Sequence, residues 1–158
     1  MTDYDIVWMI RQLDQSLEQY GREELKDLDI TLTQSLCLHY LFLQRGQKVY
    51  ATQLHRRFGI SKSAISATLS ILRKRGYLTM ENSADDDRKK QIVLTQKAFA
   101  VQGRIEEEIC SQQKRMCRSI SESELEAVEA VLIRMLDNMR QDRAKGGKND
   151  GQEDIKYD

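Results

Sequence analysis

Apolar residues recur with helical spacing in the first third of the chain. Residues 4–27 predict a helix, because their apolar positions are three and four residues apart and form one stripe. This stripe consists of Ile6, Ile10, Leu13, Leu17 and Tyr20. A second helix is expected over 33–45, where apolar residues lie on nearly all sides. Two helices in different environments are thus expected, one with a single apolar face and one buried.

The middle of the chain predicts two short helices joined by a glycine turn. Residues 52–58 allow about two helical turns with Leu54 and Phe58 facing inward, and Gly59 ends them. Ser61 is a suitable N-cap for a helix that runs to Arg75. The inward positions of this helix are Ile65, Leu69 and Leu72. Such a pair of helices is typical of a helix-turn-helix.

A β-hairpin should follow the second short helix. Gly76 ends that helix, and segments 77–81 and 91–95 alternate or carry β-branched residues. The polar loop between them is long and charged. The expected fold is therefore mainly helical with a small β-hairpin wing (α+β), in which a winged helix-turn-helix lobe is joined to a helical region.

The last third of the chain returns to the helical pattern. Residues 96–118 and 122–143 predict helices, and Ser121 with Glu124 has the spacing of a capping box at the start of the second. The second helix has a regular apolar stripe at Leu125, Val128, Leu132, Met135 and Met139. Residues 144–158 are rich in glycine and charged side chains, so we expect a disordered tail there.

Charge is unevenly distributed, although the formal net charge of the chain is zero. Residues 45–97 hold 12 Lys/Arg and 4 Asp/Glu, a net charge of +8. Residues 1–44 hold 3 Lys/Arg and 8 Asp/Glu, a net charge of −5. A basic segment that follows an acidic one predicts that the middle of the chain meets a polyanion.

The exposed side of the helix after Ser61 carries small polar groups and cations. The second helix of a helix-turn-helix places its N-terminal residues in the major groove, and small residues allow a close approach to base edges. We therefore predict DNA contacts for Ser61, Lys62, Ser63, Ser66, Ala67, Ser70, Arg73 and Lys74. A solvated amphipathic helix is the alternative, and the charged hairpin that follows favours DNA.

The loop of the hairpin places three acids directly before three bases. An arginine at such a tip can enter the narrow, electronegative minor groove, and a nearby aspartate can hold its guanidinium in place. We predict that Arg88, Lys89 and Lys90 contact DNA and that Asp86 supports Arg88.

Two segments resemble the MarR-type transcriptional regulators. Residues 86–95, DDRKKQIVLT, resemble that family's wing pattern of D-x-R followed by five residues and L-T. Residues 60–78 resemble its recognition helix, with G-Y-L at the end where G-L-(V/I) is usual. Ala67 and Ser70 depart from the family, which often has an arginine and an acid there, so the operator sequence cannot be copied from a relative.

The resemblance covers roughly residues 4–143 and implies one regulator domain over 1–143. It implies a DNA-binding lobe over 46–95 and dimerisation helices over 4–27 and 96–143, so that a homodimer binds pseudo-palindromic double-stranded DNA. The apolar stripes of the first and last helices support a dimer, because so small a lobe cannot cover both; a monomeric bundle is the alternative. The implied function is transcriptional repression controlled by a small ligand or a redox signal. The alternative is a winged-helix module that binds protein.

Several side chains are candidates for sensing. The resemblance implies an effector crevice that Trp8, Tyr20, His39 and Tyr40 can line, although each of these residues is more often plain core. Cys110 and Cys117 lie seven residues apart on one predicted helical face and can cross-link or sense redox state, since Lys114 and Arg115 provide nearby cations.

The sequence offers no support for an enzyme, a cofactor or a bound metal. It has no CxxC pair, no HExxH motif, no phosphate-binding glycine loop and no nucleophile motif. The longest apolar run, residues 36–43, is far shorter than the about 20 residues of a membrane span. The N-terminus lacks the basic region of a signal peptide, so we expect a cytoplasmic protein.

Overall fold

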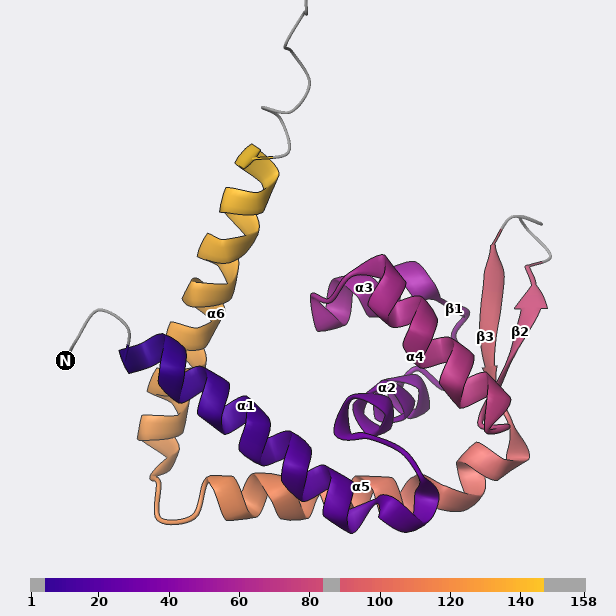
Figure 1. Cartoon of the computed structure of the whole chain (residues 1–158), viewed down its shortest axis with the longest axis horizontal. Helices are drawn as coiled ribbons and strands as arrows, with labels where there is room; N and C mark the ends of the chain where they lie inside the picture. Colours follow the sequence, from indigo (N-terminus) through magenta and orange to yellow (C-terminus); the bar gives the residue numbers. More distant parts are fainter. Residues whose placement is uncertain (1–4, 84–88, 147–158) are drawn as a thin grey trace, which may run out of the picture. The chain divides into compact units, whose positions relative to one another are not determined.

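The computed structural model describes residues 5–83 and 89–146, with side chains described up to residue 141 of the last helix. The chain divides into two units, residues 1–115 and 116–158, and each is described by itself. The first unit holds the expected winged lobe with the helices on either side of it, and the second holds the last helix (Figure 1).

The N-terminal helices are joined by a tight, ordered turn. Helix α1 (Asp5–Glu24) ends before the predicted residue 27, and the 3-10 turn η1 (Lys26–Leu28) follows. Helix α2 (Leu32–Leu43) begins with a capping box, in which the Thr31 hydroxyl accepts from the Gln34 backbone and the Gln34 side chain accepts from the Thr31 backbone. We call residues 25–31 the α1–α2 joint.

A glycine lets α1 approach α2 closely. Gly21 is buried, and a Cβ atom added to it would lie 2.9 Å from the Leu32 Cβ. That distance is below van der Waals contact, so a side chain at position 21 would force the two helices apart. The close approach holds the C-terminal end of α1 against the start of α2.

The helix-turn-helix is confirmed by helices α3 (Ala51–Phe58) and α4 (Lys62–Lys74). Gly59 ends α3 with a left-handed φ of 65°, which glycine adopts without steric cost. The Ser61 hydroxyl caps α4 as predicted, accepting from the Ala64 backbone at 3.1 Å. The His55 Nδ1 donates to the Ile60 carbonyl at 2.5 Å, which ties the turn back onto α3.

Three strands form an antiparallel sheet with the order β1–β3–β2. The predicted hairpin is present as β2 (Leu78–Asn82) and β3 (Lys90–Leu94), with Met80 opposite Ile92. The short strand β1 (Val49–Tyr50) pairs with the other edge of β3, and the sequence pattern did not predict it. Two residues are too few to show a strand's alternation of apolar and polar positions.

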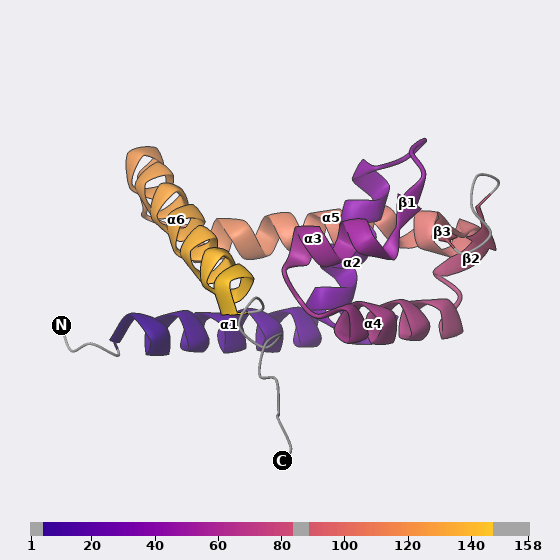
Figure 2. The same cartoon turned by 90° about the horizontal axis from the view of Figure 1, so that it is seen from above.

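Helix α2 lies at the centre of the first unit, as its all-round apolar pattern predicted. Both views show it between α4 and α5 (Gln96–Met116), with the hairpin extending to one side (Figures 1 and 2). All of these elements contribute to one core, whose completely buried members include Leu25, Leu38, Leu54, Leu72 and Ile105. The core thus joins the helix-turn-helix firmly to the helices on either side of it.

Helix α6 (Glu122–Gly146) belongs to the second unit and continues beyond the predicted end at residue 143. Its capping box is confirmed, because the Ser121 backbone donates to Glu124 Oε2 at 2.8 Å. Hydrogen bonds from Ser121 also hold the pKa of Glu124 below its usual value. The rest of the predicted disordered tail lies outside the described residues.

The buried carboxyl group of Glu108 in α5 leads to a stability prediction. This side chain is 8% exposed, and among the described residues its Oε1 has no hydrogen-bond partner. Burial, followed by the nearby Glu24 carboxylate, raises the pKa of Glu108. A carboxyl whose pKa is raised by folding destabilises the folded protein when ionised, so stability should fall as pH rises through the raised pKa.

We therefore expect Glu108→Gln to increase the free energy of unfolding at pH 8 by about 1 kcal/mol, the scale of a buried unsatisfied polar group. The gain should shrink toward pH 3.5, which lies below the pKa of about 4.3 of an unperturbed glutamate, because the wild-type carboxyl is then largely protonated in both the folded and unfolded states. Urea unfolding at both pH values measures this, with the exposed neighbour Glu107→Gln as control. A loss of stability that is the same at both pH values would contradict the prediction.

Candidate nucleic-acid interface

Helix α4 has one buried apolar face and one exposed polar face. Ile65, Leu69 and Leu72 are buried in the core at 2%, 4% and 0% exposure. The predicted DNA-contacting residues lie on the rest of the surface. Those that are exposed are Ser61, Lys62, Ser63, Ser66, Ala67, Arg73 and Lys74, while Ser70 is half-buried. The pattern read from the sequence therefore places these residues correctly with respect to the core.

The start of α4 combines a capping hydroxyl with an exposed cation. Ser61 Oγ lies 3.0 Å from Ser63 Oγ in addition to capping the helix, so both hydroxyls are engaged within the first turn. Lys62 is exposed beside them. The N-terminal end of a helix carries a partial positive charge, and together with Lys62 it favours an anionic partner.

Two adjoining hollows connect α4 with the base of the wing. The first is lined by Ser66, Leu69, Ser70 and Arg73 of α4 together with Ala51 and Met80. The second is lined by Lys89 and Lys90 of the wing together with Tyr50, Ala51, Thr52 and Met80. The two hollows share Ala51 and Met80, so the predicted contacts that line the first hollow lie near the two wing lysines that line the second.

Hydrogen bonds fix the base of the wing. The Ser83 backbone donates to the Lys89 carbonyl at 3.0 Å, which closes the hairpin on its tip side. The Tyr50 hydroxyl lies 3.0 Å from Ser83 Oγ and thereby ties the wing to the start of α3. Lys89 and Lys90 are exposed, whereas Asp86 and Arg88 lie outside the described residues.

Sequence reasoning missed two exposed cations on α3. Arg56 and Arg57 occupy the last turn of this helix, and both are exposed. The first helix of a helix-turn-helix crosses the DNA backbone, where arginine binds phosphate. Their signal in the sequence was the pair of bases just before the glycine turn.

The predicted effector residues lie in different surroundings. Trp8 is 65% exposed on α1. Tyr20 packs under the Arg115 guanidinium at 4.8 Å, and Tyr40 meets Phe58 edge-on at 6.2 Å between ring centres. His39 is half-buried on α2, and its Nδ1 has no hydrogen-bond partner among the described residues. Tyr20 thus packs on α5, whereas Tyr40 packs on α3.

The cysteines do not share one helical face as predicted. Cys110 is exposed on α5, but this helix ends at Met116 and Cys117 lies in the turn that follows. The chain turns because the Ile120 backbone donates to the Cys117 carbonyl and Ser119 adopts a left-handed φ of 65°. Cys37 is buried, and burial raises the pKa of its thiol to about 12, as expected for a packing residue.

Within the described ranges, no group of three or more His, Cys, Asp or Glu side chains is arranged to hold a metal ion. None of the helices in the described part of the chain is long and apolar enough to span a membrane.

A helix-turn-helix with an exposed second helix, followed by an antiparallel hairpin, defines a winged helix-turn-helix protein. Residues 28–89 match the model of the MarR family. This match covers the winged lobe and agrees with the resemblance of its wing and recognition helix to the MarR-type regulators.

Solved structures of transcription regulators share the fold. MarR from Oenococcus oeni PSU-1 is 24% identical, with a TM-score of 0.75 over 84% of this chain and 99% of that one. A MarR family regulator from Listeria monocytogenes, solved with 26mer DNA, is 18% identical, with a TM-score of 0.80 over 99% and 100%. The organohalide-sensing regulator RdhR, solved with 2,4-dichlorophenol, is 24% identical, with a TM-score of 0.76 over 87% and 82%.

Proposed function

We propose that this chain is a sequence-specific, DNA-binding transcriptional regulator and that it acts as a homodimer. The observation that carries the proposal is the exposed polar and basic face of α4, together with the exposed Lys89 and Lys90 at the base of the wing. A regulator of the same fold binds DNA in its solved structure, which supports the same use of this surface. The proposed role is that of a regulator and not of an enzyme.

In this proposal, α4 lies in the major groove and the wing reaches the adjacent minor groove. The small side chains of Ser66 and Ala67 let α4 approach base edges, and Ala67 can meet a thymine methyl group. Lys62 reaches either a guanine edge or a phosphate. Arg88 enters the minor groove and Asp86 holds its guanidinium, a role we infer from the wing sequence.

Exposed apolar side chains support the dimer. On α1, Ile6, Ile10 and Leu13 belong to one apolar stripe and are 39%, 47% and 49% exposed. On α6, considered separately, Val128, Leu136 and Met139 are 52%, 55% and 62% exposed. Apolar surface on this scale marks an interaction site, and a two-fold partner would cover it. The two copies of α4 would then meet successive major grooves about 34 Å apart.

We also propose that the protein is a repressor whose DNA affinity is modulated by a small ligand or a redox signal. A regulator of similar fold was solved with a chlorinated phenol, which supports a small aromatic effector. The candidate residues are Trp8, Tyr20, His39 and Tyr40 for the ligand and Cys110 and Cys117 for redox sensing.

Salt dependence tests DNA binding directly. If two protomers neutralise about 6–10 phosphates, the logarithm of the binding constant should fall against the logarithm of salt concentration with a slope of about −5 to −9. Fluorescence anisotropy on an operator selected from random duplex, and on a scrambled duplex, measures both affinity and preference. A slope near zero, or no binding at low salt, would favour the protein-interaction module instead.

A further inference from the structure

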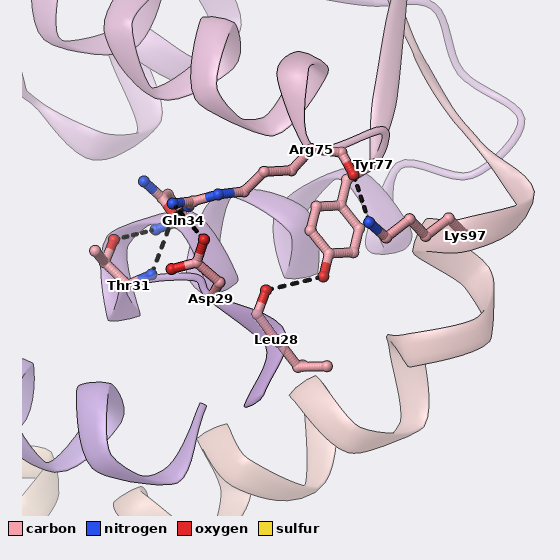
Figure 3. A network of polar contacts seen from close by, with 7 residues as sticks. All are labelled: Leu28, Asp29, Thr31, Gln34, Arg75, Tyr77 and Lys97. Atoms are coloured by element: carbon pink, nitrogen blue, oxygen red, sulfur yellow. Dashed lines mark hydrogen bonds and ion pairs between the residues drawn. The ribbon is translucent and has the colours of Figure 1, made fainter. Parts of the chain in front are cut away.

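The C-terminal end of α4 is attached to the α1–α2 joint through Arg75. This residue is the C-cap of α4, and its guanidinium lies 2.9 Å from Asp29 Oδ2. The same guanidinium donates to Gln34 Oε1 at 3.0 Å. Figure 3 shows the side chain reaching from the end of α4 toward Asp29 and Gln34. Arg75 therefore joins three elements: α4, the joint and α2.

The receiving groups are themselves held in place. Gln34 Oε1 also accepts from the Thr31 backbone at 3.1 Å as part of the cap of α2. Asp29 adopts a left-handed φ of 53°, and its backbone donates to the Lys26 carbonyl at 3.2 Å. The carboxylate and the amide thus present their oxygens to Arg75 from a turn whose backbone is already fixed.

A second attachment lies beside the first. The Tyr77 hydroxyl donates to the Leu28 carbonyl at 3.1 Å, and Tyr77 is only 2% exposed. Lys97 Nζ lies 4.6 Å from the centre of the Tyr77 ring and donates to the Arg75 carbonyl at 2.6 Å. The segment that leaves α4 is therefore held both by the joint and by the start of α5.

We propose that Arg75 is a positioning residue that sets the orientation of α4 relative to α1, an inference that rests on the proposed DNA-binding function. In the sequence, Arg75 directly follows the basic residues Arg73 and Lys74 at the helix end. In the structure, however, its guanidinium is engaged with Asp29 and Gln34 and its side chain is only 32% exposed. It acts on DNA through α4 and does not itself contact phosphate.

The contact is better suited to orientation than to stability. The Asp29 side chain is 82% exposed, and ion pairs of such exposed groups contribute little to the free energy of folding. The pair nevertheless restricts how α4 can tilt relative to the joint. Since α1 carries the apolar surface assigned to the dimer, the pair links the dimer helix to the helix that reads DNA.

Two substitutions that each remove one negative charge can distinguish a positioning role of Arg75 from a general electrostatic effect on DNA binding. Asp29→Asn removes the acid that pairs with Arg75, and asparagine tolerates a left-handed backbone. Asp27→Asn removes an acid two positions away whose oxygens both accept from Arg104 of α5 at 2.9 Å. Loss of an acid alone should strengthen DNA binding slightly in both variants. The proposal predicts instead that Asp29→Asn weakens operator binding about fivefold to tenfold, whereas Asp27→Asn does not.

The measurement is operator affinity by anisotropy over a range of salt concentrations, with thermal unfolding of each full-length variant. Arg75→Met provides a second variant and should weaken binding to a similar extent with an unchanged salt slope. A slope that drops by about one per lost phosphate contact would show that Arg75 binds DNA itself and would overturn the proposal. Equal operator affinities of Asp29→Asn and Asp27→Asn would also overturn the positioning role of Arg75. In that case, operator binding by the wild type would still support the proposed DNA-binding function. Failure of the wild type to bind would overturn both.

Discussion

Replacing Ile10 and Leu13 of α1 by aspartate should convert the dimer into a monomer and weaken binding to the full operator by at least on the order of a hundredfold. The two side chains are 47% and 49% exposed in the single chain, so neither is needed for the core of its own protomer. In a dry dimer interface, however, two carboxylates would lose their hydration without gaining partners. A monomer would also lose the gain in affinity that comes from binding two linked half-sites.

Sedimentation and operator titration measure the two effects on the same samples. Gln12→Asp with Gln15→Asp is the matched control, because it adds the same charge at exposed polar positions of the same helix. If the variant with Ile10→Asp and Leu13→Asp stays dimeric at micromolar concentration, α1 lies outside the dimer interface. A folded monomer with undiminished operator affinity would refute the two-fold arrangement on DNA.

Leu72→Ala should lower the free energy of unfolding by about 2–5 kcal/mol, the range for truncating a large buried side chain. Leu72 is completely buried on the inner face of α4, within the core that α4 shares with the helices on either side. The loss combines reduced apolar burial with a cavity that the surrounding close-packed side chains cannot fully close. Because α4 carries most of the predicted DNA contacts, operator affinity should fall as the folded fraction falls.

Urea unfolding followed by circular dichroism measures the change, and Ile71→Ala is the control. Ile71 precedes Leu72 on the same helix but is 36% exposed, so its truncation should cost much less. Equal losses at the two positions would mean that the buried face of α4 is assigned wrongly.

The sequence could predict those features that depend on a few neighbouring residues. Ser61 caps α4, Gly59 ends α3 and Ser121 with Glu124 caps α6, each as predicted. In all three cases the signal and the contact lie within one helical turn. The spacing of apolar residues predicted the buried face of α4. The exposed positions of Lys62 and Arg73 followed from the location of that face.

Features that depend on distant partners could not be predicted. The segment KDLD after α1 is compatible with a longer helix, but Arg104 of α5 binds both Asp27 and the Glu24 carbonyl and holds a turn there. Arg75 follows two other basic residues, and nothing in the neighbouring sequence indicates that its side chain turns toward Asp29. The roles of Arg88 and Asp86 stay predictions from the wing pattern.

The pairing of β1 with β3 has a consequence for the order in which the lobe assembles. Val49 pairs with Ile92 across the whole of α3, α4 and β2, whereas the contacts that start α4 lie within a few residues. Closing a long loop costs more conformational entropy than forming contacts between neighbouring residues. Helix α4 can therefore form well before the sheet is complete. During refolding, helical signal should therefore appear ahead of operator-binding competence. In a newly synthesised chain, α4 would therefore form before the sheet is complete. Specific DNA recognition would begin only once β1 has paired with β3.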